Sequence, residues 1–103
     1  METGNSVASL SAAGFQARSP QTAKQQELYA ALPSNKIECC KAKGKVLYVF
    51  KDEKAGVAYI GGESQHQKYL QLCRQQHLAQ PPEEEMSHPF AMSWSNQWGP
   101  RLD

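Results

Sequence analysis

The chain has 103 residues, 40 % of them hydrophobic and 20 % charged, and its formal net charge at pH 7 is +1. This length leaves room for one domain, and the near-neutral charge argues against a protein that binds nucleic acid through its overall charge. No apolar run approaches the roughly 20 residues that a membrane-spanning helix needs, so we expect no membrane partner.

The N-terminal residues carry small and polar side chains without apolar periodicity, and we expect a disordered segment at residues 1–18. They lack the basic start and the apolar stretch of a secretory signal. Residues 3–18 are free of acidic side chains, rich in Ser and Ala, and end in Arg18, which keeps a mitochondrial presequence as an alternative. The single arginine and the early Glu2 weaken that alternative.

Start and stop signals predict a first helix at about residues 20–32. Ser19 can cap it with a proline as the first helical residue, and Thr22 with Gln25 offers a second capping box. Pro33 ends the helix, because a proline cannot continue the hydrogen-bond ladder.

Three strands follow, and the one at residues 45–50 has the clearest pattern. Its side chains are apolar on both faces, with Val46, Tyr48 and Phe50 on one and Leu47 and Val49 on the other. This pattern predicts a central strand that is covered on both sides, or on one side and by a partner on the other.

A second helix is predicted after the glycine pair that follows the last strand. Ser64 and Gln67 form a capping box, and the pair Pro81-Pro82 lies beyond the end of the helix. The elements together predict an α+β fold with a small antiparallel sheet and helices on one face. We expect two or three strands (37–40, 45–50, 57–60), helices at about 20–32 and 64–78, and a flexible N-terminus and C-terminal tail.

The predicted domain organisation has three parts. Residues 1–18 form the disordered segment, residues 19–80 form the folded α+β domain, and residues 81–103 form a Pro/acidic linker with an aromatic tail. A folded unit of about 60 residues is marginal by itself, so we expect the tail or a partner to add stability.

Three cysteines bear on location and chemistry. Three is an uneven and small number of cysteines for a disulfide framework, so we predict reduced thiols in a cytoplasmic or nuclear protein. Cys39, Cys73 and His77 are the residues nearest to a zinc site, and the fourth ligand would have to be His66 or water. Cysteine–histidine catalysis lacks a helix that begins at a cysteine and an obvious orienting group. We expect no cofactor and no enzymatic activity, and a small zinc- or cysteine-dependent protein remains an alternative.

Lysines gather around the predicted hairpin. Residues 36–54 hold six lysines against three acidic residues. Lysines at a sheet edge have a solubility explanation, since they discourage edge-to-edge pairing. Nucleic-acid binding is nevertheless an alternative function, with aromatic side chains of the strand as stacking platforms. The lysines assigned to it are Lys41, Lys43, Lys45, Lys51 and Lys54.

The aromatic C-terminal tail is the most distinctive part of the chain, because it holds both tryptophans. Large aromatic residues and methionine anchor protein interfaces, and Phe90, Met92, Trp94 and Trp98 are the predicted partner-binding residues. The tail could instead cover the exposed face of its own sheet. We predict a non-enzymatic protein–protein interaction module, an adaptor or a small subunit of a larger complex, that uses the aromatic tail and the exposed sheet or helix surface. Oligomerisation stays open.

Overall fold

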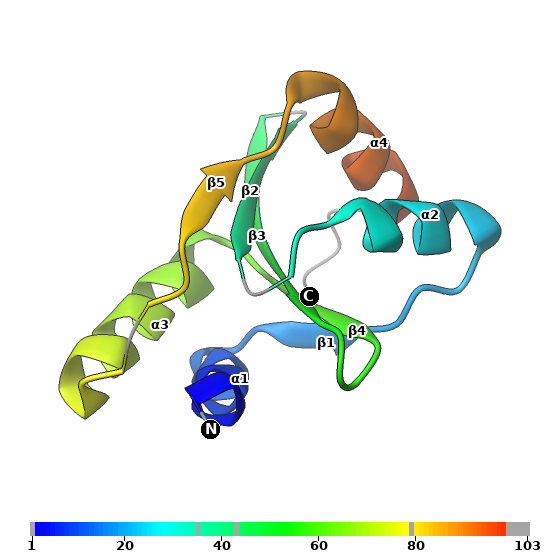
Figure 1. The fold of residues 1–103 in the computed structure, drawn as a ribbon. Helices are drawn as coiled ribbons and strands as arrows, with labels where there is room; N and C mark the ends of the chain where they lie inside the picture. Colours follow the sequence, from blue (N-terminus) through cyan, green and yellow to red (C-terminus); the bar gives the residue numbers. More distant parts are fainter. Residues whose placement is uncertain (1, 35, 43, 79, 99–103) are drawn as a thin grey trace.

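The computed structural model describes residues 2–34, 36–42, 44–78 and 80–98, with the backbone alone at residues 2–7. The described part is an α+β domain with a Cα radius of gyration of 12.7 Å, close to the roughly 12.8 Å expected for a compact domain of this length. Its elements follow in the order α1 (Glu2–Ala13), β1 (Gln16–Arg18), α2 (Ala23–Ala31), β2 (Ile37–Ala42), β3 (Lys45–Asp52), β4 (Val57–Gly61), α3 (Glu63–Gln76), β5 (Glu83–Glu85) and α4 (His88–Trp98) (Figure 1).

The sheet has five strands in the order β1-β4-β3-β2-β5 (Figure 1). Neighbouring strands run antiparallel except β2 and β5, which are parallel. The sheet is therefore mixed, and β3 lies at its centre, as the apolar residues on both of its faces indicate.

Two tight turns join the three inner strands. Gly44 in the β2–β3 turn has φ +73°, and Gly56 in the β3–β4 turn has φ +69°. Residues with a side chain rarely adopt this left-handed conformation. Glycine at these positions therefore sets the turns and with them the strand register. In that register Cys39 pairs with Tyr48, and Tyr48 pairs with Gly61.

Helices cover both faces of the sheet, with α2 and α4 on one and α1 and α3 on the other (Figure 1). Along β3, Leu47 and Val49 point to the α2/α4 face, whereas Tyr48 and Phe50 point to the α1/α3 face. Each face has its own hydrophobic cluster. The α2/α4 cluster is built from Leu28, Leu32, Cys40, Ala42, Leu47, Val49, Ala58, Ile60, Met86, Ala91, Trp94 and Trp98. The α1/α3 cluster is built from Leu10, Ala13, Phe15, Ile37, Phe50, Tyr69 and Cys73.

The predicted small sheet of two or three strands is wrong, and so is the expected placement of helices on one face. The inner strands lie within two residues of their predicted ends, but β1 and β5 widen the sheet at both edges. Each edge strand has three residues, which is too short for a pattern with a period of two, and β5 consists of glutamates alone. Neither strand therefore carries the usual sequence signal.

The predicted flexible ends are also wrong for the described residues. The helix α1 and the strand β1 occupy the N-terminal segment, and β5 and α4 occupy most of the C-terminal one. Pro89 lies in the first turn of α4, where the missing amide donor costs little, so it does not prevent the helix. Residues 99–103 of the predicted tail lie outside the described residues.

Both predicted helices exist, but each begins elsewhere than expected. The N-cap of α2 is Thr22, whose side chain accepts from the Gln25 amide at 3.1 Å, so the second predicted capping box is the one used. The N-cap of α3 is Gly62, whose amide donates to the Gln65 side chain at 3.0 Å. The predicted box at Ser64 and Gln67 is thus displaced by two residues.

Candidate functional site

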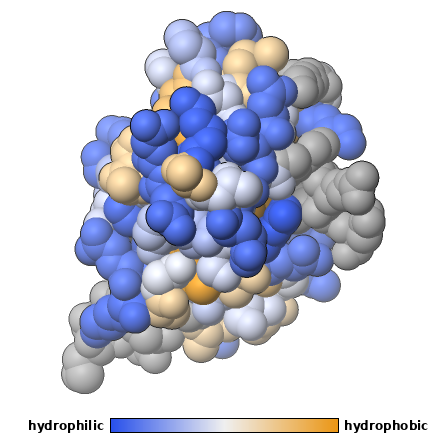
Figure 2. Space-filling model, turned by 90° about the vertical axis from the view of Figure 1, so that its right-hand side faces the viewer, coloured by the Kyte–Doolittle hydropathy of each residue, from blue (hydrophilic) through white to orange (hydrophobic). Residues whose placement is uncertain are grey.

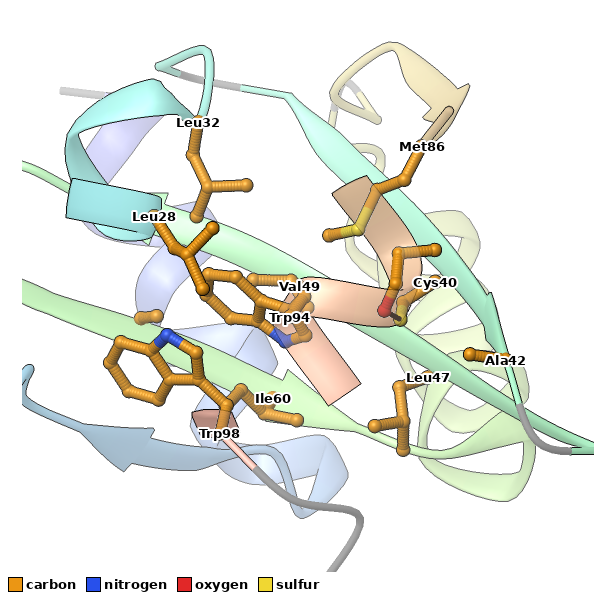
Figure 3. Close-up of a cluster of buried hydrophobic side chains, with 12 residues drawn as sticks. Leu28, Leu32, Cys40, Ala42, Leu47, Val49, Ile60, Met86, Trp94 and Trp98 are labelled. Atoms are coloured by element: carbon orange, nitrogen blue, oxygen red, sulfur yellow. Dashed lines mark hydrogen bonds between the residues drawn. The ribbon is translucent and has the colours of Figure 1, made fainter. Parts of the chain in front are cut away.

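The aromatic residues of the C-terminal segment lie on the helix α4, and both tryptophans belong to the core. Trp94 is 0 % exposed and Trp98 is 2 % exposed. Together with Ala91 and Ser95 they occupy one helical face at i, i+3, i+4 and i+7 spacing, and this face is buried against the sheet. The two indole rings stack with centroids 4.7 Å apart and an interplanar angle of 11°. Figure 3 shows Trp94 in the middle of the α2/α4 cluster with Trp98 beside it.

Phe90 and Met92 are half-buried and pack against the same cluster. The outer surface on the side of α2 and α4 is mainly hydrophilic, with apolar residues scattered singly (Figure 2). Scattered apolar residues of this kind do not mark an interaction site. A partner could reach the two tryptophans only if α4 left the sheet, so their role in partner binding stays a prediction.

Hydrogen bonds from other elements hold α4 in place. The Arg18 guanidinium donates to the Trp98 carbonyl at 2.9 Å, and the side-chain amide of Gln25 donates to the Gln97 carbonyl at 2.7 Å. The Cys40 thiol donates to the Ala91 carbonyl at 3.5 Å. A polar hollow of about 290 Å³ lies at this end of α4, lined by Ala17, Arg18, Ser19, Gln21, Gln25 and Trp98. Arg18 and Gln25 line this hollow, and their polar groups are used to hold α4 in place.

The three cysteines do not form a reactive or metal-binding site within the described residues. Cys40 and Cys73 are buried, and burial raises the pKa of the Cys40 thiol to about 11. Cys39 is half-buried, and burial raises the pKa of its thiol although Lys41 acts in the opposite direction. His77 lies at the C-cap of α3, and no three His, Cys, Asp or Glu side chains of the described chain could hold a metal ion together. The predicted ligand set Cys39, Cys73 and His77 is therefore not assembled.

A buried histidine joins three elements of the fold, which the sequence did not indicate. The His66 ring of α3 stacks on the Tyr48 ring of β3, with centroids 3.8 Å apart and an interplanar angle of 6°. Its Nε2 lies 2.8 Å from a carboxylate oxygen of Glu83 in β5, while Nδ1 has no hydrogen-bond partner among the described residues. The Tyr48 hydroxyl is hydrogen-bonded to the Cys39 thiol. These contacts fasten β5 to the sheet and to α3.

A pair of carboxyl groups lies on the opposite face of the same sheet edge. Glu38 is buried and its side chain is hydrogen-bonded to that of Glu84, which also forms an ion pair with Lys36 at 3.1 Å. Burial raises the pKa of Glu38, and the neighbouring Glu84 raises it further. Burial and the neighbouring carboxyl group of Glu84 thus both act against ionisation of Glu38.

The lysines assigned to nucleic-acid binding do not lie on one surface. Lys41 and Lys45 flank the β2–β3 turn, whereas Lys54 lies in the turn at the other end of β3. With about 3.3 Å per strand residue, the two ends of β3 are roughly 23 Å apart. Lys51 is buried, donates to the Leu32 carbonyl at 3.2 Å and lies 5.0 Å from the centre of the Tyr29 ring. Lys43 lies outside the described residues.

The lysines beside the β2–β3 turn border an apolar hollow, here called the hairpin-tip hollow. It has a volume of about 410 Å³ and lies between the turn and the first residue of α4. Ala42 and Lys45 pair with each other on the α2/α4 face, beside His88, whereas Lys41 and Val46 pair with each other on the α1/α3 face. The hollow is lined by Lys41, Ala42, Gly44, Lys45, Val46 and His88. On the α2/α4 side, Ala42, Lys45 and His88 together offer a ligand one apolar and two basic side chains.

The start of α4 is the electropositive end of the hairpin-tip hollow. The first turn of α4 carries no acidic side chain that would offset the positive end of its helix dipole. Lys41 has a distant partner, since its Nζ lies 3.9 Å from a carboxylate oxygen of Glu85 and both side chains are mostly exposed. His88 was missed by the sequence analysis, because it comes more than 40 residues after the hairpin and only the folding of α4 brings it there.

Comparison of the chain with protein-family models, curated proteins and solved structures gives no match. Among the described residues, no helix combines the length and the apolar character that a bilayer crossing requires. The function is therefore argued from the geometry of the chain itself.

Proposed function

We propose that this chain is a non-enzymatic protein-binding domain, an adaptor or a small subunit of a larger complex, that binds its partner at the hairpin-tip hollow. The observation that carries the proposal is the hollow itself, in which Lys45 and His88 lie beside Ala42 on the α2/α4 face while Lys41 lies on the other face of the hairpin. Binding sites are typically concave and apolar, with a small number of placed polar groups. The aromatic helix α4 contributes by holding His88 at the rim, because its tryptophans fix the helix on the sheet.

The proposal is tested by affinity capture with matched lysine variants of the full chain. Lys41→Glu with Lys45→Glu reverses the charge at the rim, and we expect it to abolish recovery of the specific partner. Lys24→Glu with Lys54→Glu makes the same charge change at exposed sites away from the hollow and should leave recovery unchanged. Equal loss in both double variants would contradict the proposal, because the effect would then follow net charge and not the site.

Nucleic-acid binding through the hairpin lysines is the second candidate. It is favoured by the position of Lys41 and Lys45 at one exposed turn, and opposed by the three glutamates of β5 along the neighbouring edge. A phosphate backbone would bring a row of negative charges close to that edge. This candidate predicts an affinity for single-stranded oligonucleotides that falls steeply with salt, and no binding at low salt would eliminate it.

The proposed location of the protein is the cytoplasm or the nucleus. The three free cysteines support it, because thiols stay reduced in those compartments. The mitochondrial alternative rests on the composition of the N-terminal segment alone. Fluorescence imaging of the chain with a C-terminal tag distinguishes the compartments.

A further inference from the structure

We infer that β5 is a proton-dependent strap, which is closed at about pH 5 and opens increasingly as the pH rises towards about 8. The strand lies between α3 and α4 in the chain and covers part of the outer edge of β2 (Figure 1). Two backbone hydrogen bonds frame it. The Ile37 amide donates to the Pro82 carbonyl at 2.9 Å, and the Met86 amide donates to the Cys39 carbonyl at 2.9 Å. The inference is independent of the hairpin-tip hollow, because it rests on the side chains of β5 and their partners.

The side chains of β5 are held to the sheet by polar contacts. All three residues of the strand are exposed glutamates. Glu84 forms an ion pair with Lys36 at 3.1 Å, and Glu85 forms one with Lys41 at 3.9 Å. Both pairs join largely exposed side chains, so each contributes little to the attachment of the strand. Lysine ammonium groups and exposed glutamate carboxylates generally keep their charges between about pH 5 and 8, so these two contacts do not respond to pH in that range.

The first contact that responds to pH lies on the α2/α4 face. Glu38 is 6 % exposed and lies directly opposite Glu84 in the β2–β5 register. Its Oε2 atom has no hydrogen-bond partner among the described residues. Burial raises the pKa of Glu38 and Glu84 raises it further, although Lys36 acts in the opposite direction. Once Glu38 ionises, two negative charges lie opposite each other on neighbouring strands, which destabilises their pairing.

The second contact that responds to pH lies on the α1/α3 face. The buried ring of His66 holds its Nε2 atom 2.8 Å from a carboxylate oxygen of Glu83. Imidazole groups generally change their charge between about pH 5 and 8. A protonated ring forms a charge-assisted hydrogen bond with a carboxylate, which is stronger than the bond of the neutral ring. The Nδ1 atom has no partner among the described residues, which opposes protonation and limits the size of the effect.

Other titratable groups near His66 stay in one charge state over this range. Tyr48 stacks on the ring, and its hydroxyl is hydrogen-bonded to the Cys39 thiol. Burial raises the pKa of both Tyr48 and Cys39, so both stay mainly neutral below about pH 8. Glu63 in the first turn of α3 also acts on Tyr48 and is exposed. The described side chains of α1, at residues 8–13, include no titratable group. The two contacts described above therefore carry the pH dependence of β5.

Both contacts weaken in the same direction. A group whose pKa is raised by folding stabilises the folded form below its ordinary pKa, and this contribution is lost as the pH rises through the raised value. Glu38 follows this rule, and loss of the proton from His66 removes the charged partner of Glu83. When β5 opens, the outer backbone groups of β2 become free to pair with another strand. Protonation of two side chains thus decides whether this edge of the sheet is covered.

The test is amide hydrogen exchange of the isotope-labelled full chain, followed by NMR between about pH 5 and 8. The amides of Ile37 and Met86 report the opening of β5, because they donate the two hydrogen bonds that frame it. The Gln26 amide, which donates to the Thr22 carbonyl at 2.9 Å, is the reference for local fraying at another helix end. Rates are corrected for the intrinsic exchange of each amide. We expect the protection of Ile37 and Met86 to fall about tenfold, because two contacts of this kind each contribute about threefold, and that of Gln26 to change less than about twofold.

Variants of the chain identify the responsible groups. Glu38→Gln with Glu83→Gln removes both contacts that respond to pH. In this double variant, the protection of Ile37 and Met86 should change less than about twofold over the same range. Glu85→Gln is the matched control, because it makes the same change on the same strand beside a lysine. The control should lower protection at every pH and keep the fall of about tenfold. Circular dichroism spectra at both ends of the pH range establish that each variant is folded.

Three results would overturn the inference. They are a protection of Ile37 and Met86 that stays constant over the range, an equal fall at Gln26, and a fall of unchanged size in the double variant. Loss of the pH dependence in Glu85→Gln would also overturn it, because the contact of that residue with Lys41 does not respond to pH.

Discussion

Truncation of Trp94 to alanine is the most decisive perturbation of this fold. The indole is 0 % exposed, lies in the α2/α4 cluster and stacks on Trp98. Removal of a buried tryptophan side chain typically costs about 3–5 kcal/mol of the free energy of unfolding. Loss of the stacked pair adds to that cost, by about 0.5–1.5 kcal/mol in typical cases.

One feature of the site reduces this cost. The indole N–H groups of Trp94 and Trp98 are buried without a hydrogen-bond partner among the described residues. A buried unpaired donor destabilises the folded state by about 1–3 kcal/mol, and Trp94→Ala removes one such donor. The stability gained by removing the unpaired donor and the stability lost with the ring stacking are of similar size. We therefore expect a net loss of about 3–5 kcal/mol in the free energy of unfolding. The variant Trp94→Phe keeps an aromatic ring and also removes the donor, and its loss should stay below about 2 kcal/mol.

Urea unfolding followed by far-ultraviolet circular dichroism measures these differences. The change in the free energy of unfolding comes from the shift of the midpoint multiplied by the slope of the transition. Gln97→Ala is the matched control, because its side chain is exposed on the same helix and its carbonyl can still accept from Gln25. We expect the control to change stability by less than about 0.5 kcal/mol.

The double variant Trp94→Ala with Trp98→Ala gives the clearest outcome. A domain of this size has a total stability of about 5–15 kcal/mol, and two losses of about 3–5 kcal/mol would remove most of it. We therefore expect the double variant to be largely unfolded at 25 °C. A folded double variant with the midpoint of the unmodified chain would refute the reasoning, because α4 would then be a free recognition segment outside the core.

Three further predictions concern other parts of the fold. Glu38→Gln should stabilise the protein at pH 7, because the raised pKa of Glu38 makes its ionisation costly in the folded state. The stability of the unmodified chain should fall as the pH rises through that pKa. In urea melts below about pH 4.5, the stability difference between the variant and the unmodified chain should vanish. Cys39 should be the one cysteine of the native protein that iodoacetamide labels, and more slowly than a free thiol, as peptide mass mapping would reveal; labelling of all three at equal rates would contradict the burial of the other two. Gly61→Ala should lower the midpoint of thermal unfolding at a cost of about 1–3 kcal/mol, because an added Cβ would lie 2.9 Å from the Phe15 ring; an unchanged midpoint would show that the ring moves aside freely.

The sequence predicted the inner part of the fold because its signals there are long and consistent. The strand β3 has eight residues, with apolar side chains on both faces over most of its length, and two glycines mark its turns. Helix α2 begins at a capping box that can be read from the residue types. Local chemistry alone specifies these elements, so their positions could be inferred without knowledge of the rest of the chain.

The outer part of the fold depends on contacts that no local pattern contains. The strand β5 consists of Glu83–Glu85, and these residues form a strand because β2 offers backbone groups and basic partners beside it. The contact between Glu83 of this strand and His66 joins residues 17 positions apart in the sequence. The spacing of Ala91, Trp94, Ser95 and Trp98 fits one helical face, although the segment was predicted to be a flexible tail. Of the residues that line the hairpin-tip hollow, Lys41 and Lys45 were named for nucleic-acid binding and His88 was not named.

The strand order has a consequence for the synthesis of the protein on the ribosome. The inner hairpins β2–β3 and β3–β4 join neighbouring segments and can pair as soon as residue 61 is free. The part of their α2/α4 face that α4 covers stays exposed until α4 has been made, and the contact between Arg18 and the Trp98 carbonyl spans 80 positions of the sequence. A nascent chain that stalls after β4 therefore exposes a hydrophobic sheet to chaperones and proteases, and the cell can recognise an incomplete copy by that surface.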